Sequence, residues 1–181
     1  DQSIKDADKP YARLPQFLLN YVGGNPQGLQ YEFNNDTAYF KKSINDGSAL
    51  ESSGTRIYNQ FAVRYNYLTP SWFYAIPEIS VRSINTFYDQ DSKEGRGLST
   101  SDDLEKSVAV PQFSFATGVT FEKEGKYLQS ISPRAFYAYS PYKKQDDHPN
   151  FDSTTASINY DQLFNPYRFY GHDRLDDNNF L

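Results

Sequence analysis

The sequence contains no cysteine and no methionine among its 181 residues. Without cysteine, neither a disulfide framework nor a thiolate metal site can form in this chain. Without methionine there is no initiator residue, and no signal peptide precedes the first polar residues, so we expect a piece of a longer or processed chain.

Long hydrophobic runs are also absent. Apolar residues make up 38% of the sequence and the mean hydropathy is −0.77. No run reaches the roughly 18 apolar residues of a membrane-spanning helix. Basic residues are scattered and the net charge is −5, which argues against nucleic acid as a partner because phosphate binding needs a concentrated basic face.

Aromatic residues, by contrast, are abundant, with 16 Tyr and 14 Phe beside a single Trp. A disordered chain would be poor in them. Tyrosine is favoured where one end of a side chain is apolar and the other is wet, as in carbohydrate sites, protein interfaces and the aromatic girdles of membrane barrels. Tyr65, Tyr67, Trp72, Phe73 and Tyr74 cluster at one short turn. This cluster predicts either an interfacial girdle or local hairpin packing.

Hydrophobic residues alternate with polar ones at period two, and no segment favours a helix. The alternation predicts three β-hairpins at about 13–40, 56–88 and 107–140. In the third, Phe113, Phe115 and Phe121 share one face, opposite Gln112 and Ser114. Tight turns near Gly24, Pro70 and Lys123 alternate with long polar loops at 41–54, 89–106 and from 140 onward, as in outer-membrane barrels. We therefore expect an all-β fold, the middle section of a large antiparallel transmembrane β-barrel, with about six strands, short periplasmic turns and long extracellular loops.

Charged and amide side chains recur on the polar face of these arms. In a small dry core each charge would need a partner, whereas in the wet lumen of a wide barrel the charges cost little. The arginines of this face could contact a partner or an anionic glycolipid, since guanidinium matches phosphate, but ion pairs between neighbouring strands are the favoured interpretation. The candidate lumen-facing residues are Gln60, Arg64, Glu78, Arg82, Gln112, Glu122 and Arg134.

Four prolines lie in or near the predicted arms. Because proline removes a ladder hydrogen bond, it marks an edge, a strand start or a bulge. Pro15 and Pro111 are predicted to start strands, and Pro77 and Pro133 to interrupt pairing inside their arms.

The C-terminal third carries an ordered series of motifs. They are PRAFYAYSPYKKQ from Pro133, FD at Phe151, NYDQLF from Asn159 and RFYGHDR from Arg168, preceded by VPQFS from Val110. This series resembles the barrel domain of the LptD family of lipopolysaccharide-assembly outer-membrane proteins. The family-motif residues of the loop after Ser140 are Pro141, Tyr142, Gln145, Phe151, Asp152, Gln162, Leu163, Phe164, Gly171, Asp173 and Arg174. Mild departures include Lys143, where the family usually has arginine.

The resemblance implies a part of the translocon that inserts lipopolysaccharide into the outer leaflet of the Gram-negative outer membrane. Family members have an N-terminal jelly-roll domain that receives lipopolysaccharide from an LptA-type periplasmic bridge, and an LptE lipoprotein that plugs the barrel. This chain lacks the jelly roll and would contribute barrel wall in contact with outer-membrane lipids, lumen surface and extracellular loops. Residues 140–178 would form one long extracellular loop that folds over or into the lumen.

No constellation for catalysis, cofactor binding or metal binding is evident. The stretches Asp146–Asp147–His148 and His172–Asp173 show no zinc-ligand spacing and lie beside no nucleophile, so they are interpreted as solvated or loop-bracing residues. We expect no enzyme. Two other functions fit parts of the sequence: a general outer-membrane porin or receptor, which fits the loop alternation, and a soluble carbohydrate-binding β-sandwich, which fits the tyrosine content.

Overall fold

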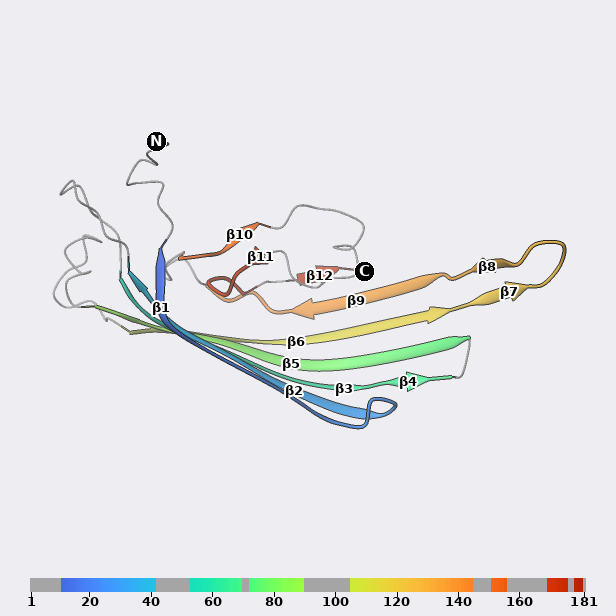
Figure 1. Ribbon diagram of the computed structural model, residues 1–181, viewed down its shortest axis with the longest axis horizontal. Helices are drawn as coiled ribbons and strands as arrows, with labels where there is room; N and C mark the ends of the chain where they lie inside the picture. Colours follow the sequence, from blue (N-terminus) through green and yellow to red (C-terminus); the bar gives the residue numbers. More distant parts are fainter. Residues whose placement is uncertain are drawn as a thin grey trace.

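A computed structural model shows a curved antiparallel sheet and describes residues 11–41, 53–69, 72–89, 105–144, 151–155, 169–175 and 178–180 (Figure 1). Its six long strands pair in chain order. They are β1 (Ala12–Gly24), β2 (Leu29–Lys41), β3 (Gly54–Tyr65), β5 (Phe73–Tyr88), β6 (Glu105–Val119) and β9 (Arg134–Ser140).

Short strands extend this sheet or lie beside it. β4 (Tyr67–Leu68) pairs with β5, and β12 (Asn178–Phe180) pairs with β9. β7 (Phe121–Lys123) pairs with β8 (Gln129–Ile131), and β10 (Thr154–Thr155) pairs with β11 (Phe169–Tyr170). The all-β antiparallel prediction is confirmed. Within the described residues the sheet is open, with β1 and β12 at its two edges.

No described segment is a helix that is long and apolar enough to cross a membrane.

The strand register gives the sheet two distinct faces. From Gln16 onward, odd-numbered residues of each strand lie opposite odd-numbered residues of the next. The odd-numbered face, here called the outer face, exposes large apolar side chains, namely Phe17, Leu19, Tyr21, Leu29, Tyr31, Phe61, Tyr65, Ile79, Val81, Phe113 and Phe115. The even-numbered face, here called the inner face, carries most of the polar and charged side chains. The alternation predicted from period two is present on the other long strands, but β1 departs from it, because its inner face exposes Leu18 and Val22.

The apolar stripe of the outer face is stepped from strand to strand. Its limits on the short-turn side are marked by three cross-strand pairs, Leu29 opposite Tyr65, Tyr67 opposite Ala75, and Phe73 opposite Val119. Beyond each pair, one of the two strands continues by one more outer-face position. In the first pair the chain continues from β3 to Tyr67 in β4, in the second β5 continues to Phe73, and in the third the chain continues from β6 to Phe121 in β7. Figure 1 shows the same stagger, with the β7–β8 tip reaching farther than the β4–β5 and β1–β2 tips.

Two of the prolines interrupt pairing as predicted. Pro77 faces the gap between β3 and β4, because Glu78 pairs with Arg64 and Ala75 pairs with Tyr67. Pro133 lies between β8 and β9, where only its carbonyl is used, accepting the Val119 N–H at 3.1 Å.

The other two prolines do not start strands, and those predictions are wrong. Pro111 lies inside β6 opposite Val81, and Pro15 lies inside β1, where the register shifts between Arg13 and Gln16. Odd-numbered residues of β6 direct their N–H groups toward β9, as Val119 does. Since β6–β9 pairing ends at Phe113, the missing N–H of Pro111 removes no bond from that ladder.

The buried core occupies the long-loop end of the inner face. Residues 151–155 and 169–175 lie on the concave side of the sheet and cover this end (Figure 1). One apolar cluster joins Tyr58, Ile84, Val108 and Val110 to Leu175. A second joins Ala38 and Phe40 to Phe151, with Tyr11 against it. The C-terminal segments are thus packed on the sheet through apolar contacts as well as the ionic contacts described next.

Candidate functional site

A buried arginine on β3 holds the C-terminal segments against the inner face. The Arg56 side chain is 0% exposed, and its guanidinium lies 2.5 Å from Asp152 Oδ1, 2.6 Å from Asp173 Oδ1 and 3.4 Å from Asp36 Oδ2. Its flat face also lies over the Phe40 ring, 4.7 Å from the centroid. Desolvating such a charge is costly unless it is paired, and three carboxylates pair it here.

Asp173 is bound by the loop backbone as well as by Arg56. Its Oδ2 accepts the N–H groups of Phe151, Asp152 and Ser153 at 2.8, 2.6 and 3.0 Å. The preceding Gly171 has a φ of 87°, and a Cβ there would lie 2.7 Å from the Asp152 carbonyl oxygen. The two C-terminal segments are therefore bound to each other as well as to the sheet.

His172 adds a second attachment to the inner face. Its ring stacks on Tyr58 with centroids 4.0 Å apart, and its Nδ1 lies 3.0 Å from Asp36 Oδ2. We refer to Arg56, Asp36, Asp152, His172 and Asp173 as the Arg56 cluster. Within the described ranges no group of three or more His, Asp or Glu side chains is arranged to hold a metal ion.

The two loop carboxyl groups respond differently to this environment. Burial opposes ionisation of Asp152, but the hydrogen bonds from Arg56 and the charges of Arg56 and Arg13 lower the pKa of Asp152 to about 2. For Asp173, burial and the neighbouring Asp152 outweigh the attraction of Arg56 and raise the pKa of its carboxyl group. Asp152 is therefore the firmly ionised partner of Arg56.

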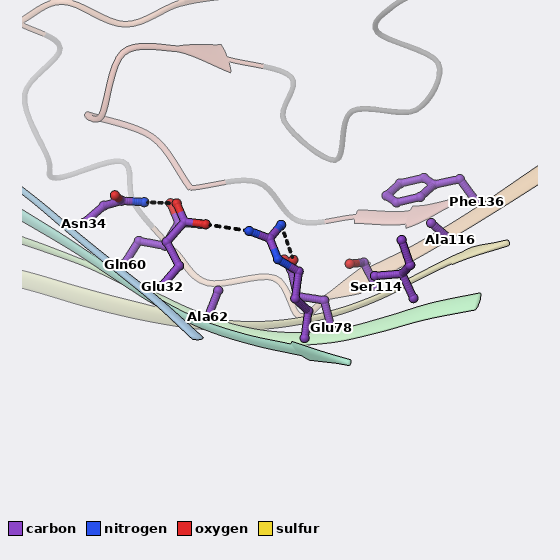
Figure 2. Close-up of a pocket in the computed structure, with 10 residues that line it drawn as sticks. Glu32, Asn34, Gln60, Ala62, Glu78, Ser114, Ala116 and Phe136 are labelled. Atoms are coloured by element: carbon purple, nitrogen blue, oxygen red, sulfur yellow. Dashed lines mark hydrogen bonds and ion pairs between the residues drawn. The ribbon is translucent and has the colours of Figure 1, made fainter. Parts of the chain in front are cut away.

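A cavity of about 460 Å³, lined by both polar and apolar side chains, opens on the inner face, nearer the short turns. Figure 2 shows its side chains pointing away from the sheet, toward the side on which the C-terminal segments lie. Arg64 lies 2.9 Å from Glu32 and 3.6 Å from Glu78, and Asn34 donates to Glu32 at 2.6 Å. These ion pairs join Arg64 to both neighbouring strands, the arrangement favoured for the arginines of this face. We call this site the Arg64 cavity.

The seven candidate lumen-facing residues do not form one site. Gln60, Arg64 and Glu78 line the Arg64 cavity. Arg82 and Gln112 are buried on the same face, nearer the long loops. Glu122 and Arg134 are exposed; Glu122 lies opposite Ser130 in the separate β7–β8 pair, and Arg134 lies opposite Gly118 at the start of β9.

The family-motif loop residues divide in the same way. Phe151, Asp152, Gly171 and Asp173 form the docked segment described above, with Arg174 next to it. Pro141 is half-buried and Tyr142 is exposed. Gln145, Gln162, Leu163 and Phe164 lie outside the described residues, as do Asp146, Asp147 and His148.

Two central residues, Arg56 and Asp36, were missing from the sequence-based candidates. Arg56 and Asp36 lie at the same strand parity as Arg64, so extending the polar face toward the long loops would have included them. His172 was considered only as a metal ligand or a loop-bracing residue, and the structure gives it the bracing position.

Comparison with known proteins agrees with the motif series. The family model described as LPS transport system D, LptD, matches residues 1–181. The LPS-assembly protein LptD of Acinetobacter baumannii is 75% identical over the whole chain, and that of Acinetobacter baylyi is 70% identical. The LPS-assembly protein LptD of Psychrobacter cryohalolentis is 44% identical over 97% of the chain. The chain spans 22% of the length of each Acinetobacter relative and 18% of that of the Psychrobacter relative. The chain therefore belongs to the LptD family.

Proposed function

We propose that this chain forms part of the wall of the outer-membrane translocon that inserts lipopolysaccharide into the outer leaflet in Gram-negative bacteria. The relatives are named for lipopolysaccharide assembly, and the family match runs along the whole chain. It favours the translocon over a general porin or a soluble carbohydrate-binding sandwich. The role is one of transport, and no enzymatic step is assigned to it.

The observation that supports a membrane position most strongly is the stepped apolar stripe of the outer face. Barrel strands about 4.8 Å apart and tilted by about 45° are displaced along their axes by about 1.4 residues per strand if one membrane plane cuts them all. The stripe steps by one outer-face position, which is two residues along the strand, at three successive strands. All three steps run in the same direction, as a tilted wall requires.

The inner face then lines the lumen. Wet surroundings accommodate the half-exposed ion pairs of the Arg64 cavity at little cost. The docked segments 151–155 and 169–175 lie on this face, which supports a long extracellular loop that folds into the lumen rather than away from the cell. In the whole protein this surface would meet the LptE plug and passing lipopolysaccharide, while the jelly roll and an LptA-type bridge would lie on the periplasmic side.

Photo-crosslinking in the full-length protein tests the proposal. A crosslinking residue is placed at Ala62, which lines the Arg64 cavity, or at its outer-face neighbour Phe61. Newly made lipopolysaccharide is labelled in a pulse and then chased. Adducts at Ala62 are expected to form with new lipopolysaccharide and to disappear during the chase, because that material is in transit. Adducts at Phe61 are expected to persist, because they report resident membrane lipid.

Comparing the crosslinkers at Ala62 and Phe61 distinguishes lipopolysaccharide in transit from lipid that merely lies near the protein. Chase-insensitive adducts at both positions, or no lipopolysaccharide adduct at Ala62 under active synthesis, would contradict a lumen position for the inner face.

A further inference from the structure

The hairpin made by β7 and β8 extends farther than the β1–β2 and β4–β5 tips (Figure 1). Its outer-face side chains are therefore not covered by those hairpins. We propose that this hairpin is a membrane-contacting element: its outer face lies against lipid of the periplasmic leaflet rather than in water or against a protein partner. The inference rests on the proposed membrane position of the sheet.

The hairpin continues the β6–β9 ladder without a change of register. Gly118 lies opposite Arg134 at the end of that ladder, and Phe121 lies opposite Ile131 after a short interruption at Pro133. The odd-numbered residues therefore stay on the outer face. Phe121 and Ile131 extend the stripe that begins with Phe113 and Phe115, so the lipid-facing surface runs unbroken into the hairpin.

The exposure of the hairpin is unusual for a turn surrounded by water. Phe121 is 62% exposed, Ile131 is 70% exposed, and Tyr127 and Leu128 at the tip are each 71% exposed. The Lys126 ammonium lies 5.8 Å from the centroid of the Tyr127 ring. Beyond the apolar pair come Lys123 opposite Gln129 and then Tyr127 and Lys126 at the tip. Lysine and tyrosine are the side chains that typically meet headgroups next to an apolar, acyl-chain-facing surface.

The stagger of the sheet explains why this hairpin is the longest. Each successive hairpin must extend farther along its own axis to reach the same membrane surface if the strands are tilted. Phe121 is the third of the three steps, so this part of the hairpin lies at the membrane level that the tilt predicts. The outer face of the hairpin is apolar at Phe121 and Ile131, and the next outer-face pair toward the tip is Lys123 opposite Gln129.

Site-specific quenching tests the inference. A fluorescent noncanonical residue replaces Phe121, Ile131, Ser130 or Phe115, one at a time, in the full-length protein. Each variant is reconstituted in vesicles of phosphatidylethanolamine and phosphatidylglycerol with brominated acyl chains, and aqueous iodide serves as the second quencher. Ser130 lies opposite Glu122 on the inner face of the same hairpin and is the matched control, while Phe115 is the reference inside the stripe. Correct assembly is checked by heat-modifiable gel mobility.

Bromine quenching at positions 121 and 131 comparable to that at 115, with iodide quenching at 130, is the expected result. Iodide quenching at 121 and 131, with bromine quenching retained at 115, would overturn the hairpin inference and leave the proposed function intact. Protection of 121 and 131 from both quenchers would mean that protein covers them, which also overturns it. Loss of bromine quenching at 115 would instead contradict the membrane position itself.

Discussion

At the scale of single residues, the fold depends on a charge that has left solvent completely. Arg56 is fully buried, whereas Arg64, on the same strand and face, is 33% exposed in its side chain. Both make ion pairs with carboxylates. Burial makes the loss of Arg56 more costly to stability than the loss of Arg64. Removing one partner of a buried pair leaves the other charges uncompensated, while exposed pairs are screened by water.

Arg56→Ala is expected to release residues 151–155 and 169–175 from the inner face. The cost is on the order of 3–5 kcal/mol, the usual range for a broken buried ion pair. Hydrogen–deuterium exchange in these two segments of the full-length protein measures it. Arg64→Ala is the control and is expected to cost about 0–1 kcal/mol with no change in the loop segments. Unchanged protection in Arg56→Ala would show that the apolar contacts of Phe151 and Leu175 suffice.

Acid should weaken the same contact through Asp152. Its folded pKa is about 2, below the roughly 3.9 of an unfolded aspartate. The stabilisation it contributes is therefore complete above about pH 4 and is lost as the pH falls toward 2. The raised pKa of Asp173 works in the opposite direction, since it favours docking at low pH and loses that contribution as the pH rises.

Asp152→Asn isolates this effect. Exchange protection of the docked segments is measured between pH 4 and pH 2 in the wild type and the variant. The acid-induced loss of protection should disappear in the variant, although its protection at neutral pH is lower. An equal acid-induced loss in both proteins would assign the transition to another group.

At the scale of strands, the outer-face stripe predicts where charge is tolerated. Ile79 and Asn85 both lie on the outer face of β5, but Ile79 is 63% exposed in the middle of the apolar stripe, whereas Asn85 lies toward the long loops, where Phe87 is the one large apolar side chain that β5 exposes on this face. Ile79→Arg is expected to destabilise the full-length protein in vesicles by about 2–4 kcal/mol, and Asn85→Arg by about 0–1 kcal/mol, the depth dependence of barrel surfaces. Denaturant titration in vesicles measures both. Equal costs would argue against a membrane boundary between the two positions.

The strands also show what the sequence can and cannot predict. The alternation of hydrophobic and polar residues predicted the strands and assigned residues such as Gln112 and Phe113 to opposite faces. It could do so because the alternation along one strand is a local property of the sequence. The effect of Pro111 was missed because it depends on which neighbour its N–H would face. The Arg56 cluster joins residues about a hundred positions apart, as Arg56 and Asp152 show. No periodicity within a strand encodes such a contact, although the family motif marked the loop half of it.

At the scale of the whole molecule, the described sheet has two unpaired edges and an apolar outer face. Among the described strands, β1 and β12 have a neighbour on one side only, and the outer face exposes apolar side chains across all six long strands. Such edges and such a face need further strands and lipid. We predict that the isolated chain refolded in detergent-free buffer gives no cooperative thermal transition by circular dichroism. A cooperative transition of a monodisperse sample would contradict this.

The central claim is that one face of the sheet is wet and the other contacts lipid. Single cysteines placed in turn from Gln60 to Arg64 on β3 of the full-length protein, reconstituted in vesicles and treated with a charged, membrane-impermeant thiol reagent, test it most directly. We predict labelling at the even positions 60, 62 and 64 and none at 61 and 63. Labelling of all five positions, or preferential labelling of 61 and 63, would contradict the account.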